Sequence, residues 1–128
     1  RTAGGFRVMA IERTFEPGSS EAEQIMTAVG ADPQFVQLCR AQRSFRARLT
    51  PKPWRCGVSV PPNDYPREDA AANAAFLAWR ADYERHGADK ATCKFAEKAG
   101  AGWAASDIEP LVRLHDEMTR ANEPLELA

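Results

Sequence analysis

The fold class is indicated by one stretch in which the apolar pattern changes its period, DPQFVQLCRAQRSFRARLTP, residues 32–51. Its first half opens with Asp-Pro, a typical helix start, and places Phe35, Leu38 and Cys39 on one helical face. In residues 44–50 apolar side chains instead alternate with arginines, which is typical of a half-buried strand. A change from a period of 3.6 to a period of two within so short a stretch predicts a mixed α+β fold.

A second strand is expected near the start of the chain. Residues 6–15 are rich in apolar and β-branched residues, and the Gly4-Gly5 pair before them suits a tight hairpin turn. Too few residues precede that turn to make the other strand of the hairpin. We therefore expect residues 1–128 to be one α+β domain, the C-terminal part of a longer protein, with an upstream segment of its own precursor as the strand's partner.

Helical spacing predicts most of the remaining elements. Ser20 and Ser106 are each followed three residues later by a glutamate, so both are expected to begin a helix with a capping box. Gly30 is expected to end the first of these helices. For residues 89–99 a helix is favoured, and a strand through Cys93 and Phe95 is the alternative. The predicted helices are residues 20–29, 32–42, 68–86, 89–99 and 106–121. The expected architecture is four or five helices on one side of a small, mostly antiparallel sheet that is incomplete in this chain.

Length and composition indicate an ordinary globular domain. The chain has 128 residues, 44% hydrophobic and 27% charged, and a chain of this length buries enough surface to fold without a disulfide or a metal. No apolar run is long enough for a membrane span, and no signal peptide is visible. We expect a cytoplasmic protein that does not associate with membranes.

The cysteines point to the same compartment. Cys39, Cys56 and Cys93 are odd in number and widely spaced, without a C-x-x-C pair. Reduced, buried thiols are the simplest interpretation. The alternative is a Cys3His metal site completed by His115, which residue type alone supports.

Basic residues are concentrated in residues 40–55, which contain no acidic residue. Six of the chain's 17 basic residues lie here, which leaves 11 basic and all 18 acidic residues in the rest of the chain. Arginine forks bind phosphate oxygens two at a time, and the interleaved Phe45 and Trp54 could stack on bases. We therefore predict a binding module for a phosphate-rich or nucleic-acid ligand, with the anion-binding residues Arg40, Arg43, Arg46, Arg48, Lys52, Trp54 and Arg55.

The alternative is that these arginines pair internally with acidic residues of a covering helix, with Trp54 buried as a core residue. The acidic residues available for this are Asp82, Glu84, Asp116 and Glu117. The chain would then be a structural or protein-interaction domain of a larger protein. Exposed ion pairs contribute only about 0–1 kcal/mol each, so stability alone explains a dense cluster poorly.

No recognisable catalytic motif is present, and no catalytic residue, cofactor or metal is predicted. His115 is expected to be a core histidine; the less favoured role is a catalytic base. Asp116 is adjacent in sequence and is not expected to face it on a helix.

The segment LCRAQRSFRARLTPKPWRC, residues 38–56, resembles a signature in hypothetical bacterial proteins, including cyanobacterial ones. No activity is established for that family, so the resemblance implies neither a function nor catalytic residues. A weaker similarity links residues 1–8 to a strand motif of primase–polymerase proteins. Those proteins carry a histidine after the glycine, where this chain has Phe6 and Arg7, which argues against a polymerase. The resemblance to the hypothetical bacterial proteins also extends to residues 1–7, 91–93 and 114–116.

Overall fold

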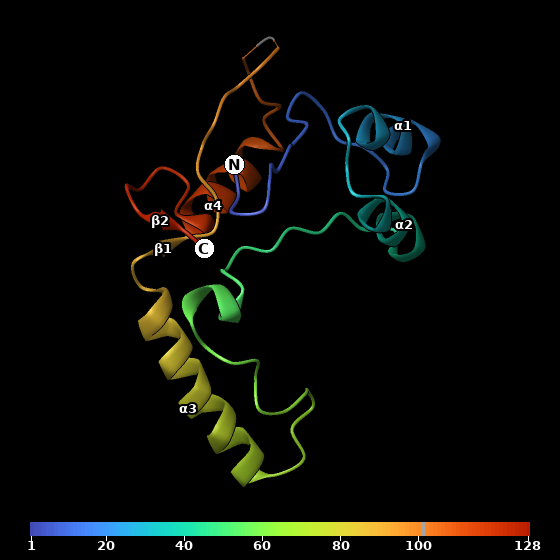
Figure 1. Cartoon of the computed structure of the whole chain (residues 1–128). Coiled ribbons are helices and arrows are strands. Elements are labelled where there is room, and N and C mark those ends of the chain that lie inside the picture. Colours follow the sequence, from blue (N-terminus) through green and yellow to red (C-terminus); the bar gives the residue numbers. More distant parts are fainter. Residues whose placement is uncertain (101) are drawn as a thin grey trace. The chain divides into compact units, whose positions relative to one another are not determined.

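The computed structural model describes residues 1–100 and 102–128. Its elements, in chain order, are α1 (Ser20–Ala28), α2 (Pro33–Gln42), the 3-10 helix η1 (Pro53–Cys56), α3 (Ala70–Gly87), β1 (Lys90–Ala91), α4 (Glu109–Thr119) and β2 (Glu126–Leu127) (Figure 1). Internal contacts divide the chain into two compact units, each made of separate stretches. The first unit comprises Arg1–Phe6, Leu49–Ala96 and His115–Ala128, and the second comprises Arg7–Arg48 and Glu97–Leu114.

The predicted fold class, an α+β domain with a mostly antiparallel sheet, is wrong. The described chain is 41% helical and 6% strand, and its one two-stranded sheet is parallel. Neither of the segments predicted as strands, residues 6–15 and 44–50, forms a strand. Alternating apolar residues favour an extended chain, but a strand also needs a neighbour to pair with. Phe6 and Val8 accordingly remain 76% and 65% exposed.

The helices of the second unit begin and end on local sequence signals. α1 starts after Ser19, whose hydroxyl accepts a hydrogen bond from the Ala22 amide at 3.2 Å. The cap therefore lies one residue before the predicted Ser20. Gly30 follows α1 with a φ of +71°, as its prediction as a helix stop requires. α2 begins as predicted, with the Asp32 carboxylate accepting from the Gln34 amide.

α1 and α2 pack against each other, and each buries one small residue, Ala22 on α1 and Cys39 on α2. The later stretch of the second unit is joined to the earlier one by a hydrogen bond of 2.8 Å from the Ala105 amide to the Ile11 carbonyl. That stretch leads into α4, which begins at Glu109 and not at the predicted Ser106.

The first unit is organised around α3 (Ala70–Gly87). This helix confirms the one predicted for residues 68–86. Trp79 and Tyr83 lie one turn apart on α3 with parallel rings, 5.3 Å between centroids. Both rings pack against a small core made of Cys56, Val58 and Ala128. The aromatic face of α3 therefore packs against residues from two stretches of this unit, Leu49–Ala96 and His115–Ala128.

The helix predicted for residues 89–99 is wrong. Lys90 and Ala91 form β1, which pairs in parallel with β2, and Cys93 forms an antiparallel bridge with Thr2. The amides of Thr92 and Cys93 both donate to the carbonyl of Thr119, the last residue of α4. The backbone of this segment finds its partners at the end of α4, so it needs no helix of its own.

The turn near the start of the chain is also displaced from its prediction. Thr2 and Gly5 form an antiparallel bridge, with a hydrogen bond of 2.7 Å from the Thr2 amide to the Gly5 carbonyl. The turn is thus centred on Ala3 and Gly4, one residue before the predicted glycine pair. The residues after it do not return as a hairpin strand.

Candidate anion-binding site

The seven residues predicted to bind an anion belong to both units. Arg40, Arg43, Arg46 and Arg48 lie in the second unit, whereas Lys52, Trp54 and Arg55 lie in the first. Each set is a site candidate in its own right, and the partners of each cation decide its chemistry.

The two arginines at the end of α2 have carboxylate partners. Arg40 Nε lies 3.6 Å from Glu23 Oε1 on α1, and Arg43 Nη2 lies 3.0 Å from Glu16 Oε1. Arg43 also caps α2 in the left-handed conformation, with a φ of +45°. These pairs join the end of α2 to α1 and to the segment that precedes α1.

Both arginines line a hollow of about 340 Å³. A side-chain carbon at Gly18 would lie 3.3 Å from Arg40 Cα, so the close approach of the chain here suits a glycine. An anion entering the hollow would compete with Glu16 for Arg43 and with Glu23 for Arg40. The remaining wall consists of Pro17 and Ser19.

Arg46 and Arg48 differ from the two preceding arginines. Both are exposed, and neither forms an ion pair with a carboxylate in residues 1–100 or 102–128. The Arg48 backbone carbonyl accepts a hydrogen bond of 2.7 Å from Arg7 Nη2. Their guanidinium groups therefore face solvent two residues apart on one extended stretch.

The acidic residues considered as internal partners have other neighbours. Asp82 on α3 pairs with Arg85 and His86 of the same helix. Glu84 pairs with Arg80, four residues earlier. Asp116 pairs with His115, and Glu117 has no ion pair within the described residues.

Trp54 is not a core residue, contrary to one of the two interpretations of the sequence. It is 60% exposed on η1. The Arg55 guanidinium carbon lies 4.5 Å from the centroid of its ring, and the Lys52 ammonium lies 5.7 Å away. Lys52 and Arg55 likewise have no carboxylate partner in the described part of the chain.

The turn that carries Trp54 is held at both ends. Before η1, the Pro51 carbonyl accepts a hydrogen bond of 2.7 Å from the Tyr83 hydroxyl of α3. After it, Gly57 adopts a left-handed φ of +73°, and the Val58 amide donates to the Pro53 carbonyl at 3.0 Å. The Trp54 indole thus lies on a turn that hydrogen bonds hold in place on both sides.

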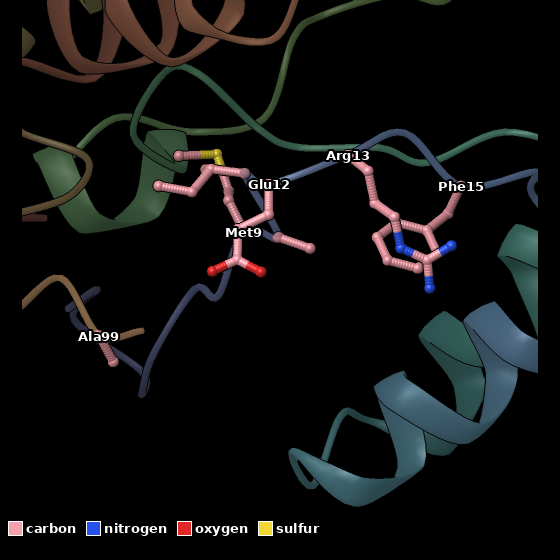
Figure 2. Close-up of a pocket in the computed structure, with 7 residues that line it drawn as sticks. Met9, Glu12, Arg13, Phe15 and Ala99 are labelled. Atoms are coloured by element: carbon pink, nitrogen blue, oxygen red, sulfur yellow. The ribbon is translucent and has the colours of Figure 1, made fainter. Parts of the chain in front are cut away.

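A second hollow of the second unit, about 200 Å³ in volume, does not suit an anion (Figure 2). Arg13, the cation on its wall, lies over the Phe15 ring and is paired with Glu21. Glu12 adds a carboxylate to the same wall (Figure 2). The other lining residues are apolar: Met9, Ala10, Ile11 and Ala99.

Sequence reasoning missed a histidine–aspartate pair. His115 Nδ1 lies 2.8 Å from Asp116 Oδ1, so the expectation that these neighbours do not face each other is wrong. Both side chains bend to the same side of α4, where His115 is buried and its carbonyl accepts from the Thr119 hydroxyl. The adjacent carboxylate in sequence was the available signal. The pair orients the imidazole.

The alternative Cys3His site is not formed. Cys39, Cys56 and Cys93 are all buried free thiols, and burial raises the pKa of the Cys56 thiol. Among the described residues, no three His, Cys, Asp or Glu side chains are placed to hold a metal ion. Nor does that part of the chain contain a helix long and apolar enough to cross a membrane.

The basic residues of the candidate site therefore form two groups, those with a carboxylate partner and those without one. Arg40 and Arg43 face glutamates, whereas Arg46, Arg48, Lys52 and Arg55 do not. Comparison of the chain with protein-family models, with curated protein sequences and with solved structures finds no match.

Proposed function

We propose that this chain is a binding module for an anionic, phosphate-rich ligand, nucleic acid included. One observation carries the proposal: within residues 46–55, four cationic side chains have no carboxylate partner among the described residues. A folded chain gains little from holding like charges close together in sequence, because exposed like charges repel. A polyanion would remove that repulsion. The four cations are Arg46, Arg48, Lys52 and Arg55.

The paired arginines have a different part in this proposal. Arg40 and Arg43 already satisfy glutamates, so they support the α1–α2 junction and contribute less to binding. Arg46 and Arg48 supply planar forks that match two phosphate oxygens each. Binding through such contacts releases counterions from the ligand, so it weakens as salt rises.

The test is a fluorescence anisotropy titration of a labelled single-stranded oligonucleotide at several salt concentrations. Three or four phosphate contacts give a log–log slope of about −2 to −3, at roughly 0.7 per contact for single strands. Replacing Arg46 and Arg48 together by Ala is expected to flatten the slope by about 1.4. The matched control is Arg80→Ala with Arg85→Ala, which removes the same charge from arginines paired on α3.

Two outcomes would contradict the proposal. One is absence of binding at low salt. The other is an equal loss of slope in the Arg46/Arg48 variant and in the α3 control, which would make the effect one of net charge alone.

A second candidate function, a structural or protein-interaction domain of a larger protein, is favoured by the exposed apolar side chains. Val60 is 72% exposed and Phe6 76%, so both apolar side chains are accessible to a partner protein. If the chain binds no polyanion at low salt, and its sedimentation coefficient rises with its own concentration, this second function replaces the first.

A further inference from the structure

We propose that Trp54 stacks on a nucleobase, so that the ligand of the proposed function, on which this inference rests, is single-stranded nucleic acid. A phosphate-rich ligand without bases, or a duplex whose bases are stacked internally, would make no use of an exposed indole.

The geometry of η1 separates Trp54 from the core. A 3-10 helix has three residues per turn, so side chains two positions apart lie on different sides. Cys56 is buried in the core of the first unit, 7% exposed, while Trp54 on the same turn is 60% exposed. Packing of Cys56 thus turns the indole outward.

The cations beside the ring suit a nucleotide. Arg55 and Lys52 lie 4.5 and 5.7 Å from the ring centroid, without carboxylate partners among the described residues. A base stacked on Trp54 would bring its own flanking phosphates to these two side chains. Aromatic rings combined with basic residues are how proteins hold single strands without reading their sequence.

The turn is prepared for such contact before the ligand arrives. The Tyr83 hydroxyl holds Pro51, and the Val58 amide holds Pro53. Less conformational freedom is lost on binding when the contacting group is already held in place. The indole therefore offers its area at a small entropic cost.

Another exposed aromatic residue lacks this arrangement. Tyr65 is 84% exposed, but the nearby Arg67 guanidinium lies 3.4 Å from the Phe76 ring and 5.8 Å from that of Tyr65. The Arg67 cation is thus directed to α3. Tyr65 provides a matched aromatic control.

The experiment compares three ligands of equal charge on the full chain: an oligothymidine, the same strand with abasic sites, and inorganic polyphosphate. Stacking of one base corresponds to at least about a fivefold gain in affinity. The wild-type chain is expected to bind oligothymidine at least about fivefold tighter than the abasic strand. Trp54→Ala should abolish that preference and leave polyphosphate affinity and the salt slope unchanged.

Trp54→Phe is expected to restore part of the preference, and Tyr65→Ala to leave it intact. Equal binding of the abasic and base-carrying strands by the wild-type chain would overturn the inference. A loss of polyphosphate affinity in Trp54→Ala equal to the loss for oligothymidine would overturn it as well. In both cases salt-dependent polyphosphate binding would still support the proposed function, whereas no binding to any of the three ligands would remove the function itself.

Discussion

The end of α2 and the η1 turn carry the same residue types in opposite surroundings. At the end of α2, Arg40 and Arg43 each face a glutamate. At η1, Lys52 and Arg55 face the Trp54 ring. The sequence between these regions, residues 44–51, contains two arginines and no acidic residue, so the difference comes from what the neighbouring elements offer.

α1 and the segment before it are rich in glutamate, and packing of α1 on α2 brings those carboxylates to the arginines. α3 instead presents aromatic rings, Trp79 and Tyr83, to the segment that contains η1. One region uses its cations to join two helices. The other leaves them exposed beside an indole.

The largest effect is expected from removing the aromatic support of η1. Trp79→Ala deletes a ring that packs on the core, stacks on Tyr83 and donates to the Ser59 carbonyl at 2.9 Å. We expect a loss of about 3 kcal/mol in the free energy of unfolding, measured by urea denaturation. Leu77→Ala, on the same helix but 50% exposed, is the control and should cost less than about 1 kcal/mol.

The two regions also carry one buried cysteine each, which makes the Trp79 experiment specific. Cys39 lies on α2 and Cys56 on η1. Because a buried thiol reacts only when its surroundings open, Trp79→Ala should accelerate alkylation of Cys56 and leave that of Cys39 unchanged, as followed by mass spectrometry. Equal acceleration at both thiols would show that the two regions open together.

A smaller effect separates the paired arginines from the unpaired ones. Arg40→Ala with Arg43→Ala should lower the free energy of unfolding by about 0–1 kcal/mol for each pair. The salt slope of oligonucleotide binding should change by less than half the change seen for the Arg46/Arg48 double variant. An equal change in slope would mean that the glutamates do not keep Arg40 and Arg43 from the ligand.

The smallest effect concerns a paired arginine in the first unit. Arg120, like Arg43, has a left-handed backbone, with φ values of +57° and +45°. The hydrogen bond that the Arg120 guanidinium donates to the Glu123 carboxylate lowers the pKa of that carboxyl below its ordinary value of 4.5. A carboxyl whose pKa is lowered in the folded state stabilises the fold at pH values above its ordinary pKa. That stability is lost as the pH falls through the folded-state pKa. An NMR titration should give a Glu123 midpoint below 4.5, and Arg120→Gln should return it to the ordinary range. An unchanged midpoint in that variant would assign the shift to another group.

The features predicted correctly from sequence depend on near neighbours in the chain. The Asp32 cap, the Gly30 stop and the α3 helix each rest on contacts within a few residues. The strands expected for residues 6–15 and 44–50 require a partner far along the chain, which alternation does not specify. The segment after α3, predicted as a helix, is instead extended because its amides donate to carbonyls at the end of α4.

The candidate site was predictable as a composition but not as an arrangement. The absence of acidic residues in residues 40–55 is plain in the sequence. Which arginines meet glutamates depends on the packing of α1, and the exposure of Trp54 depends on the burial of Cys56 on the same turn. The His115–Asp116 pair depends on side-chain rotamers, which helical spacing does not determine.

The parallel pairing of β1 with β2 has a consequence for the order in which the chain can fold during synthesis. The Ala128 amide donates to the Ala91 carbonyl, and Ala128 lies in the core beside Cys56 and Val58. The core beneath the turn that carries Trp54 is therefore complete only after residue 128 has left the ribosome. The α1–α2 pair, made of residues close together in sequence, can form while the rest is still being translated. The η1 turn that we propose for binding therefore gains its full core only after β2 has been translated.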